Sequence, residues 1–436
     1  MAGEWRCHEV SRLIGEGRLV IGDGYRAKNE ELGTRGLPFA RAGNINEGFR
    51  FADADRFPEE DLCRVGSKVS QPGDVVFTSK GTVGRFAFVR PTTPRFVYSP
   101  QLCFWRSTDE QAILPRFLYY WMCGREFHSQ FTGVAGQTDM AEYVSLGDQR
   151  RMSVTLPPLP EQRAIAHILG TLDDKIELNR RMNETLEAMA RALFRSWFVG
   201  FDPVRAKAEG RDPGLPAHLD ALFPDSFEDS ELGEIPKGWR VGRVADFASL
   251  NPESWSMGTR PASISYVDLS NTKWGRIESV AAYGPDDAPS RAQRVLRPRD
   301  TIVGTVRPGN GSYAFVAEGG LTGSTGFAVL RPLRAEHAEF VYLAATDAGS
   351  IEGLANLADG GAYPAVRPEV VAATQVTRPG RDVVEVFSRI AQPLLAKMAG
   401  NERESRTLAA LRDALLPRLI SGEIHVVSAA ATRARS

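Results

Sequence analysis

The sequence predicts an α+β protein built from two related domains, each followed by a long helix. Three observations lead to this fold class: a length of 436 residues, an internal repeat, and a heptad pattern in the helical part of each copy. A chain of this length exceeds a single ordinary hydrophobic core, so two or three domains are expected.

The repeat is clearest toward the end of each copy. An offset of 222 residues, the difference between positions Asn179 and Asn401, aligns proline, aliphatic and glycine positions along both segments. The preceding segments match more weakly, for example Pro-Gly-Asp at 72–74 with Pro-Arg-Asp at 298–300. Few of these matches follow from composition, so they indicate tandem duplication of a domain plus a helix.

The first part of each copy alternates short β-type runs with turns rich in Gly and Pro, which is typical of an α+β domain. In the first copy we expect strands at 74–81, 84–90 and 96–106 and a helix at 114–124. In the second we expect strands at 300–306, 312–318 and 326–332 and a helix at 337–346. The predicted segments are a domain at 1–155, a helix at 156–201, a linker at 202–233, a domain at 234–380, a helix at 381–424 and a flexible tail at 425–436.

The two helices carry apolar residues in steps of four and three, the heptad seam of a coiled coil. The seam positions are Ile165, Leu169, Leu172, Ile176, Asn179, Leu186 and Leu193 in the first helix, and Phe387, Ile390, Leu394, Met398, Asn401, Leu408 and Leu415 in the second. A buried pair of Asn179 and Asn401 would fix the register of the two helices. The alternative is that both asparagines lie at the solvated edge of the seam.

The motifs argue against a catalytic centre in this chain. There is no G-x-x-x-x-G-K-[ST] phosphate loop, and Asp202-Pro203-Val204 is the nearest match to the N/D-P-P-[FY] motif of adenine methyltransferases. The four cysteines are scattered without the spacing of a zinc site, so no metal is expected. The absence of a run of eighteen apolar residues and the polar N-terminus favour a cytoplasmic protein without a membrane span.

Residues 156–204, LPPLPEQRAIAHILGTLDDKIELNRRMNETLEAMARALFRSWFVGFDPV, closely resemble the central conserved region of type I restriction–modification specificity subunits. The shorter LRDALLPRLISGEI at 411–424 resembles the distal conserved region of that family. The order of variable domain, conserved helix, variable domain and second helix matches over essentially the whole chain. The LPPLPEQ opening of a long amphipathic helix is a specific motif, whereas the variable domains carry none.

The resemblance implies that each domain is a target-recognition domain for one half of a bipartite DNA site. It implies that the helices form an antiparallel coiled coil, so that the molecule has pseudo-two-fold symmetry like the DNA duplex. The implied partners are double-stranded DNA, two adenine methyltransferase subunits docked on the helices, and restriction/translocase subunits. The chain would hold no cofactor, because S-adenosylmethionine, ATP and Mg would be bound by those partner subunits.

Polar side chains in Gly-rich loops are the candidates for DNA contact, because glycine lets the backbone approach phosphate. In the first domain they are Arg41, Asn44, Asn46, Thr78, Ser79, Lys80, Arg85, Gln137 and Thr138. In the second they are Thr305, Arg307, Asn310, Ser312, Tyr363 and Arg367. Each of them can equally be an ordinary solvated turn residue.

The net charge bears on how the chain would bind DNA, and two other functional classes are the alternatives. The formal net charge of −1 is unlike that of an independent DNA-binding protein, so we expect partner subunits to supply much of the basic surface. A two-domain scaffold that binds only proteins would use the same duplicated architecture. A self-contained restriction–modification enzyme is disfavoured by the missing motifs.

Overall fold

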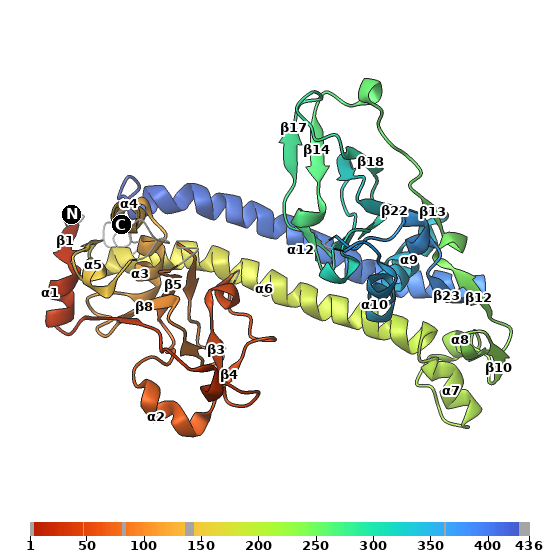
Figure 1. The fold of residues 1–436 in the computed structure, drawn as a ribbon, viewed down its shortest axis with the longest axis horizontal. Helices are drawn as coiled ribbons and strands as arrows, with labels where there is room; N and C mark the ends of the chain where they lie inside the picture. Colours follow the sequence, from red (N-terminus) through yellow and green to blue (C-terminus); the bar gives the residue numbers. More distant parts are fainter. Residues whose placement is uncertain (1–3, 47, 81–83, 136–143, 362, 427–436) are drawn as a thin grey trace, which may run out of the picture. The chain divides into compact units, whose positions relative to one another are not determined.

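The computed structural model describes residues 4–46, 48–80, 84–135, 144–361 and 363–426. The chain forms two compact units (Figure 1). Unit 1 comprises Met1–Glu177 with Ser405–Ser436, and unit 2 comprises Leu178–Glu404. The two 40-residue helices, α6 (Leu159–Phe198) and α12 (Arg381–Ile420), each contribute residues to both units, whereas the sequence suggested helices separate from the domains.

Unit 1 is an α+β domain with short strands, as predicted. Its strands are β1 (Arg6–Glu9), β2 (Leu19–Asp23), β3 (Leu37–Ala40), β4 (Arg56–Phe57), β5 (Val75–Thr78), β6 (Phe86–Phe88), β7 (Val97–Tyr98), β8 (Leu102–Ser107) and β9 (Ser153–Leu156). Its helices besides α6 and α12 are α1 (Val10–Gly15), α2 (Leu62–Val65), α3 (Pro115–Met122), α4 (Arg125–Ala135) and α5 (Leu146–Arg150), with short 3-10 turns that include η2 (Ala42–Ile45).

Unit 2 repeats this arrangement. Its strands are β10 (Phe227–Ser230), β11 (Gly233–Pro236), β12 (Arg240–Arg243), β13 (Ala248–Leu250), β14 (Ile264–Val267), β15 (Thr272–Lys273), β16 (Arg276–Ile277), β17 (Ala281–Tyr283), β18 (Ala292–Leu296), β19 (Thr301–Gly304), β20 (Tyr313–Phe315), β21 (Leu321–Ser324), β22 (Phe327–Pro332) and β23 (Gln375–Arg378). Its helices are α7 (Asp202–Ala208), α8 (Ala217–Asp220), α9 (Ala338–Ala345), α10 (Ala348–Leu357) and α11 (Pro368–Ala372), with 3-10 turns that include η6 (Leu269–Asn271) and η7 (Pro308–Asn310).

The sheet topology demonstrates the duplication more clearly than the sequence does. The four-stranded sheet β2-β8-β5-β6 of unit 1 has its counterpart in β13-β22-β19-β20 of unit 2. The antiparallel pair β1-β9 corresponds to β12-β23. The parallel pairing of β3 with β7 corresponds to that of β14 with β21, where β14 lies between β17 and β21. Figure 1 shows β14 beside β17. Both units therefore place the same loops at the ends of equivalent strands.

A buried ion pair closes the same turn in each unit. The Asp74 carboxylate accepts two hydrogen bonds from the Arg106 guanidinium, at 2.6 and 2.7 Å, and one from the Gln71 amide at 2.8 Å. Asp300 accepts equivalent bonds from Arg331, at 2.9 and 2.8 Å, and from the backbone amide of residue 297 at 2.8 Å. Both aspartates are fully buried, which makes the pairs structural rather than catalytic.

Within each unit the segments of α6 and α12 run antiparallel and bury the predicted seam. In unit 1, Ile165 and Leu169 share a core with Leu419. In unit 2, residues of α6 around Phe194 pack on Phe387 and its neighbours. Half-buried seam positions accompany them: Leu172, Ile176, Leu186, Leu193, Leu394, Met398, Leu408 and Leu415.

The seam asparagines are buried in unit 2 and are 1% exposed, so they do not lie at a solvated edge. The Asn179 side-chain amide donates to the Asn401 carbonyl at 3.4 Å and to a Glu404 carboxylate oxygen at 2.9 Å. Asn401 in turn donates to the side-chain oxygen of Asn183 at 2.8 Å. These bonds form only in one register of the two helices, as expected for a buried polar pair.

The heptad pattern predicted wrongly that Ile390 lies in the buried seam. Its side chain is exposed, and Ala391 and Leu395 face the core in its place. The strict step of three after Phe387 therefore fails, because a straight helix of 3.6 residues per turn moves the buried stripe to the next residue. Ile390 instead borders a groove with Leu222 of the segment that follows α8.

Residues 202–233, expected as a linker, contain α7, α8 and the first strand of the β10-β11 hairpin. Val204 and Phe223 are buried in the core of unit 2, where the Phe223 ring meets the Trp197 indole at 5.0 Å. At the other end of the chain, His425 of the expected tail lies 2.8 Å from the Glu161 carboxylate, and residues 427–436 lie outside the described residues.

Candidate nucleic-acid interface

In unit 1, segments that are far apart in sequence meet at Ser79. The Ser79 amide donates to the Gln101 carbonyl at 3.0 Å, and the Val144 amide donates to the Ser79 carbonyl at 3.1 Å. The Gln101 side-chain oxygen accepts from the Ala42 amide at 3.2 Å, which ties η2 to the same place. We call this set of contacts the loop junction of unit 1. It joins the segment around Ser79 to η2 and to Val144, the first described residue after the gap at 136–143.

Unit 2 contains the same loop junction. The Thr305 amide donates to the Gly326 carbonyl at 2.9 Å, and the Val366 amide donates to the Thr305 carbonyl at 2.9 Å. The Ser312 hydroxyl donates to the carbonyl of Leu269 in η6 at 3.1 Å. Thr305, Gly326 and Val366 occupy the places of Ser79, Gln101 and Val144. The duplicated fold therefore positions equivalent loops twice, with different side chains on them.

Four of the predicted contact residues are buried within these loop junctions. Thr78, Ser79, Thr305 and Ser312 are between 0 and 7% exposed. The Thr78 hydroxyl oxygen accepts from the Arg85 amide at 3.1 Å, and the Ser79 hydroxyl accepts from the Cys103 thiol at 3.2 Å. Their hydroxyls are occupied by the protein, so they hold the loops in place and do not reach the surface.

Other predicted residues of unit 1 lie at the surface. Arg41 pairs with the Asp55 carboxylate at 2.7 Å, and the half-buried Asn44 accepts from the Arg41 amide at 2.8 Å. Asn46 and Lys80 are exposed, and Arg85 is half-buried. Gln137 and Thr138 lie outside the described residues.

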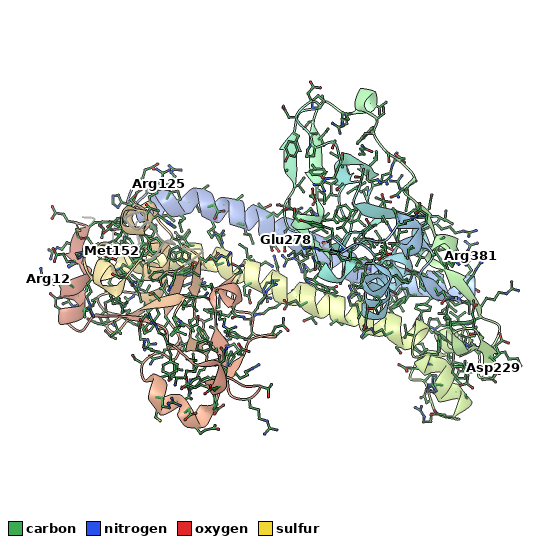
Figure 2. The ribbon with its side chains drawn as sticks, viewed as in Figure 1. Arg12, Arg125, Met152, Asp229, Glu278 and Arg381 are labelled. Atoms are coloured by element: carbon green, nitrogen blue, oxygen red, sulfur yellow. The ribbon has the colours of Figure 1, made fainter. Side chains whose placement is uncertain are left out.

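In unit 2 the predicted residues Arg307, Asn310, Tyr363 and Arg367 are exposed. The Arg307 guanidinium carbon lies 4.7 Å from the centre of the Tyr363 ring, so residues 56 positions apart in sequence (363 − 307) form one surface feature. Figure 2 draws the side chains on the ribbon, except those whose placement is uncertain.

The sequence analysis did not identify Gln101 of the loop junction of unit 1, nor Trp274 in the hairpin next to the loop junction of unit 2. Gln101 gave no signal, because its role depends on tertiary contacts. Trp274 is 56% exposed at the tip of the β15-β16 hairpin, and a tryptophan in the polar turn T-K-W-G-R is an unusual turn residue that could have been noticed.

A carboxylate organises the base of the loop junction of unit 2. Asp268 accepts from the Tyr266 hydroxyl at 2.8 Å and from the Leu269 amide at 2.6 Å. Burial, reinforced by the Asp268 charge, raises the pKa of Tyr266 to about 12. The phenol therefore stays protonated and serves as a hydrogen-bond donor, with no acid–base role near neutral pH.

The carboxylates on the α6 face of unit 1 serve ion pairs. Asp173 accepts from the Tyr120 hydroxyl at 2.6 Å and from Arg412 at 2.8 Å. Burial opposes ionisation of Asp174, but the paired guanidiniums of Arg116 and Arg90 lower the pKa of its carboxyl. Both aspartates therefore stabilise helix packing.

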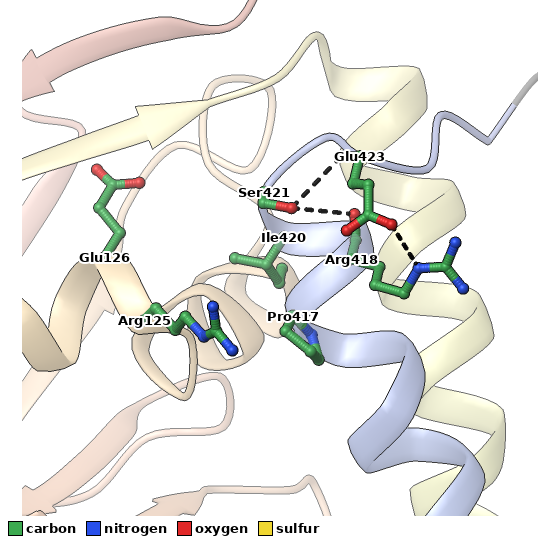
Figure 3. Close-up of a pocket in the computed structure, with 7 residues that line it drawn as sticks. All are labelled: Arg125, Glu126, Pro417, Arg418, Ile420, Ser421 and Glu423. Carbon is green, nitrogen blue, oxygen red and sulfur yellow. Dashed lines mark hydrogen bonds and ion pairs between the residues drawn. The ribbon is translucent and has the colours of Figure 1, made fainter.

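A pocket in unit 1, between α4 and the end of α12, offers no free acid–base pair (Figure 3). The Arg418 guanidinium donates to the Glu423 carboxylate at 2.8 Å. Glu126 uses one carboxylate oxygen for the Trp121 indole at 3.0 Å and the other for the Thr155 hydroxyl at 2.8 Å. Glu126, Arg418 and Glu423 are thus engaged with each other or with neighbouring residues of unit 1.

Within the described residues, no group of three or more His, Cys, Asp or Glu side chains is arranged to hold a metal ion. No helix in this part of the chain combines the length and apolar character needed to cross a bilayer.

Comparison with known proteins identifies the architecture. Residues 21–188 match the family model described as the type I restriction modification DNA specificity domain. The HindI specificity subunit of Haemophilus influenzae is 26% identical over 419 residues, covering 84% of this chain and 89% of that protein. The MjaIX specificity subunit of Methanocaldococcus jannaschii is 22% identical over 388 residues, covering 84% and 81%. The crystal structure of a type I S subunit from M. genitalium superposes with a TM-score of 0.57 at 15% identity, covering 95% of this chain and 96% of that one, which shows a shared fold.

Proposed function

We propose that this chain, which belongs to the family of type I restriction–modification specificity subunits, recognises a bipartite DNA sequence on behalf of an adenine methyltransferase. Each unit reads one half of the site through its loop junction. The chain itself carries out no chemistry. It acts in the cytoplasm, with S-adenosylmethionine, ATP and Mg²⁺ bound by the partner subunits.

The observation that carries this proposal is the duplication of the loop junction. The contacts around Ser79 recur around Thr305, while the side chains displayed on the loops differ between the units. A repeated scaffold with different surface side chains suits two readers of two different half-sites, because base identity is read by side chains and orientation is set by the backbone. Two methyltransferase subunits would dock on α6 and α12, and restriction/translocase subunits would join that complex.

Mapping of methylated bases tests the proposal. The chain is co-expressed with its methyltransferase partner in a host without adenine methylation, and the modified sites are sequenced. We expect one motif of two short specific halves separated by unspecified bases, and no motif when the methyltransferase is expressed alone. Methylation without any sequence preference would contradict DNA reading and favour the protein-binding scaffold.

A second measurement addresses the net charge of −1. Phosphate contacts make DNA affinity fall steeply with salt. We expect the isolated chain to bind DNA weakly, and the complex with the methyltransferase to bind tightly with a steep salt dependence. Tight binding by the isolated chain, equal to that of the complex, would show that the partner supplies no basic surface.

A further inference from the structure

The β15-β16 hairpin of unit 2 carries a tryptophan at a position where neither the backbone nor the core accounts for it. Trp274 has φ 47°, the left-handed region that costs energy for a bulky residue and suits glycine. Its side chain is 56% exposed, so burial in the core does not compensate this cost. Backbone strain at such an exposed side chain points to a function of that side chain.

The indole of Trp274 is held in a fixed orientation. The Trp274 amide donates to the Gly311 carbonyl at 2.7 Å, and the Gly275 amide donates to the Tyr313 carbonyl at 2.9 Å. A Cβ on Gly311 would lie 2.5–2.7 Å from three atoms of the indole, so Gly311 faces the plane of the ring rather than its edge. The Tyr313 ring lies 6.0 Å from the indole at an interplanar angle of 87°. One face of the indole therefore rests on unit 2, and the exposed part of the ring includes the other face.

The hairpin lies between the loop junction of unit 2 and the segments of the two long helices in that unit. On one side, the bond to Gly311 ties it to the loop at 305–312. On the other side, the Arg276 guanidinium lies 3.8 Å from the Glu402 carboxylate of α12. A Cβ on Gly275 would lie 3.4 Å from a carboxylate oxygen of Glu187 in α6. The indole thus borders both the loops proposed to meet DNA and the helices proposed to carry the methyltransferase.

The equivalent turn of unit 1 holds its aromatic residue differently. Both turns are closed by a backbone hydrogen bond to the carbonyl of an asparagine in the preceding 3-10 turn, Asn44 at 2.9 Å and Asn271 at 2.8 Å. In unit 1 a glycine takes the left-handed conformation, Gly48 with φ 93°. Phe49 is half-buried there, with its ring centre 4.8 Å from that of Phe96. The exposed indole is therefore a property of the unit 2 hairpin and not of the repeated scaffold.

The charge of the hairpin favours DNA as the partner of the indole. Residues 272–277 include Lys273 and Arg276 and no acidic residue, and both basic side chains are exposed. An aromatic face beside positive charge is the arrangement on which nucleic-acid bases stack. In an intact duplex each base face is covered by its neighbour, so a stacking side chain needs a step that has opened. Enzymes that modify a base open such a step when they flip the target base out of the duplex.

We propose that Trp274 stacks on a base of the DNA step that opens when the methyltransferase flips the target adenine in the half-site of unit 2. This inference rests on the proposed function. The open face of the indole covers the base that has lost its neighbour, and the backbone contacts of the hairpin hold the ring ready for it. Trp274 is then a DNA-binding residue that stabilises the opened duplex, and it takes no part in the transfer of the methyl group.

The test uses the complex of the full chain with its methyltransferase and duplexes that carry the mapped motif. The fluorescent base 2-aminopurine, which brightens when it loses its stacking neighbours, is placed beside the methylated adenine of each half-site in turn. Trp274→Gly removes the ring and fits the left-handed backbone, and Trp274→Phe keeps a smaller ring. Leu333→Ala is the matched control, because it removes a 58% exposed apolar side chain from unit 2 outside this hairpin.

We expect Trp274→Gly to lower the affinity of the complex for the motif about 5- to 150-fold, the effect of losing one contact between a base and an aromatic ring. Trp274→Phe should lower it less, and Leu333→Ala should leave it unchanged. At saturating complex, 2-aminopurine in one half-site should fluoresce more strongly with Trp274→Gly than with the original chain, because that base lacks a stacking partner. In the other half-site the fluorescence should be the same for all variants.

Several outcomes would overturn the assignment. One is unchanged affinity and fluorescence with Trp274→Gly. Another is failure of this variant to assemble with the methyltransferase in the absence of DNA, which would make Trp274 a contact to the partner protein. If Trp274→Gly unfolds unit 2 in thermal denaturation, Trp274→Asn replaces it, because asparagine also tolerates a left-handed backbone. Absence of any methylated motif with the original chain would instead refute the proposed function itself.

Discussion

The two buried ion pairs predict different costs for the same substitution in the two units. Asp74→Asn removes the carboxylate charge from the Arg106 guanidinium, which is 11% exposed, and leaves it only neutral acceptors among the described residues, such as the Val69 carbonyl at 3.1 Å. Breaking a buried pair in this way costs about 3–5 kcal/mol, because an uncompensated charge stays buried. We therefore expect a loss of that size in the stability of unit 1.

Asp300→Asn should cost less. Its partner Arg331 also contacts the Glu253 carboxylate and donates to the Val295 carbonyl at 3.2 Å. The Arg331 guanidinium keeps the Glu253 carboxylate as a counter-ion. We therefore expect Asp300→Asn to lower the stability of unit 2 by about 1–3 kcal/mol, the cost of one unsatisfied hydrogen-bonding group. The comparison is internal to one molecule, since both aspartates are fully buried at the same turn.

Hydrogen exchange of amides in β8 and β22 reports on the two units separately, and urea unfolding gives the total. Asp55→Asn serves as the control, because its pair with Arg41 is exposed and should contribute less than about 1 kcal/mol. Equal losses for Asp74→Asn and Asp300→Asn, or a larger loss for Asp300→Asn, would refute the reasoning that Glu253 compensates Arg331.

Three further predictions concern unit 2. Asn401→Leu removes a buried amide whose side-chain oxygen has no hydrogen-bond partner, so urea unfolding should show an unchanged free energy of unfolding or an increase of up to about 2 kcal/mol. A clear decrease would mean that the asparagine contacts stabilise the helix pair directly. Burial lowers the pKa of His337, so the unfolded chain binds a proton at higher pH than the folded chain, and stability should fall as the pH drops below the usual 6.5. His337→Asn should make this fall smaller between about pH 7.5 and about pH 5.5, and an identical pH profile of stability in the variant would contradict a role of His337. Gly311→Ala should displace the Trp274 hairpin and weaken DNA binding by the methyltransferase complex in a gel-shift assay, and unaltered binding would separate this hairpin from recognition.

Periodicity predicted the long elements because their signals are local. The heptad seam located α6 and α12, and the apolar runs at 114–124 and 337–346 became α3 and α9. Periodicity could not foresee that Ile390 turns outward, since a small drift per turn accumulates along a helix. The segment at 202–233 was misjudged because its many prolines and acidic residues resemble a linker, while a few aromatic residues dispersed among them secure it to the core.

The candidate interface was predicted only in part for a related reason. Gly-rich loops indicated the right regions, but a hydroxyl such as that of Thr305 looks the same in sequence whether it faces solvent or a backbone carbonyl. The stacking of Arg307 on Tyr363 joins two loops through tertiary contacts and leaves no periodic signal.

Unit 1 is built from two separate segments of the chain, and this affects its folding during synthesis on the ribosome. Leu419 and Ile420 complete a core whose other members come from residues 10–169, and the whole of unit 2 is translated between them. At a translation rate of about 5–20 residues per second, the apolar surface of the N-terminal segment stays uncovered for tens of seconds before the end of α12 is synthesised. Nascent chains stalled before residue 405 should therefore recruit chaperones, whereas unit 2, continuous in sequence, acquires its partners in the order in which they are made.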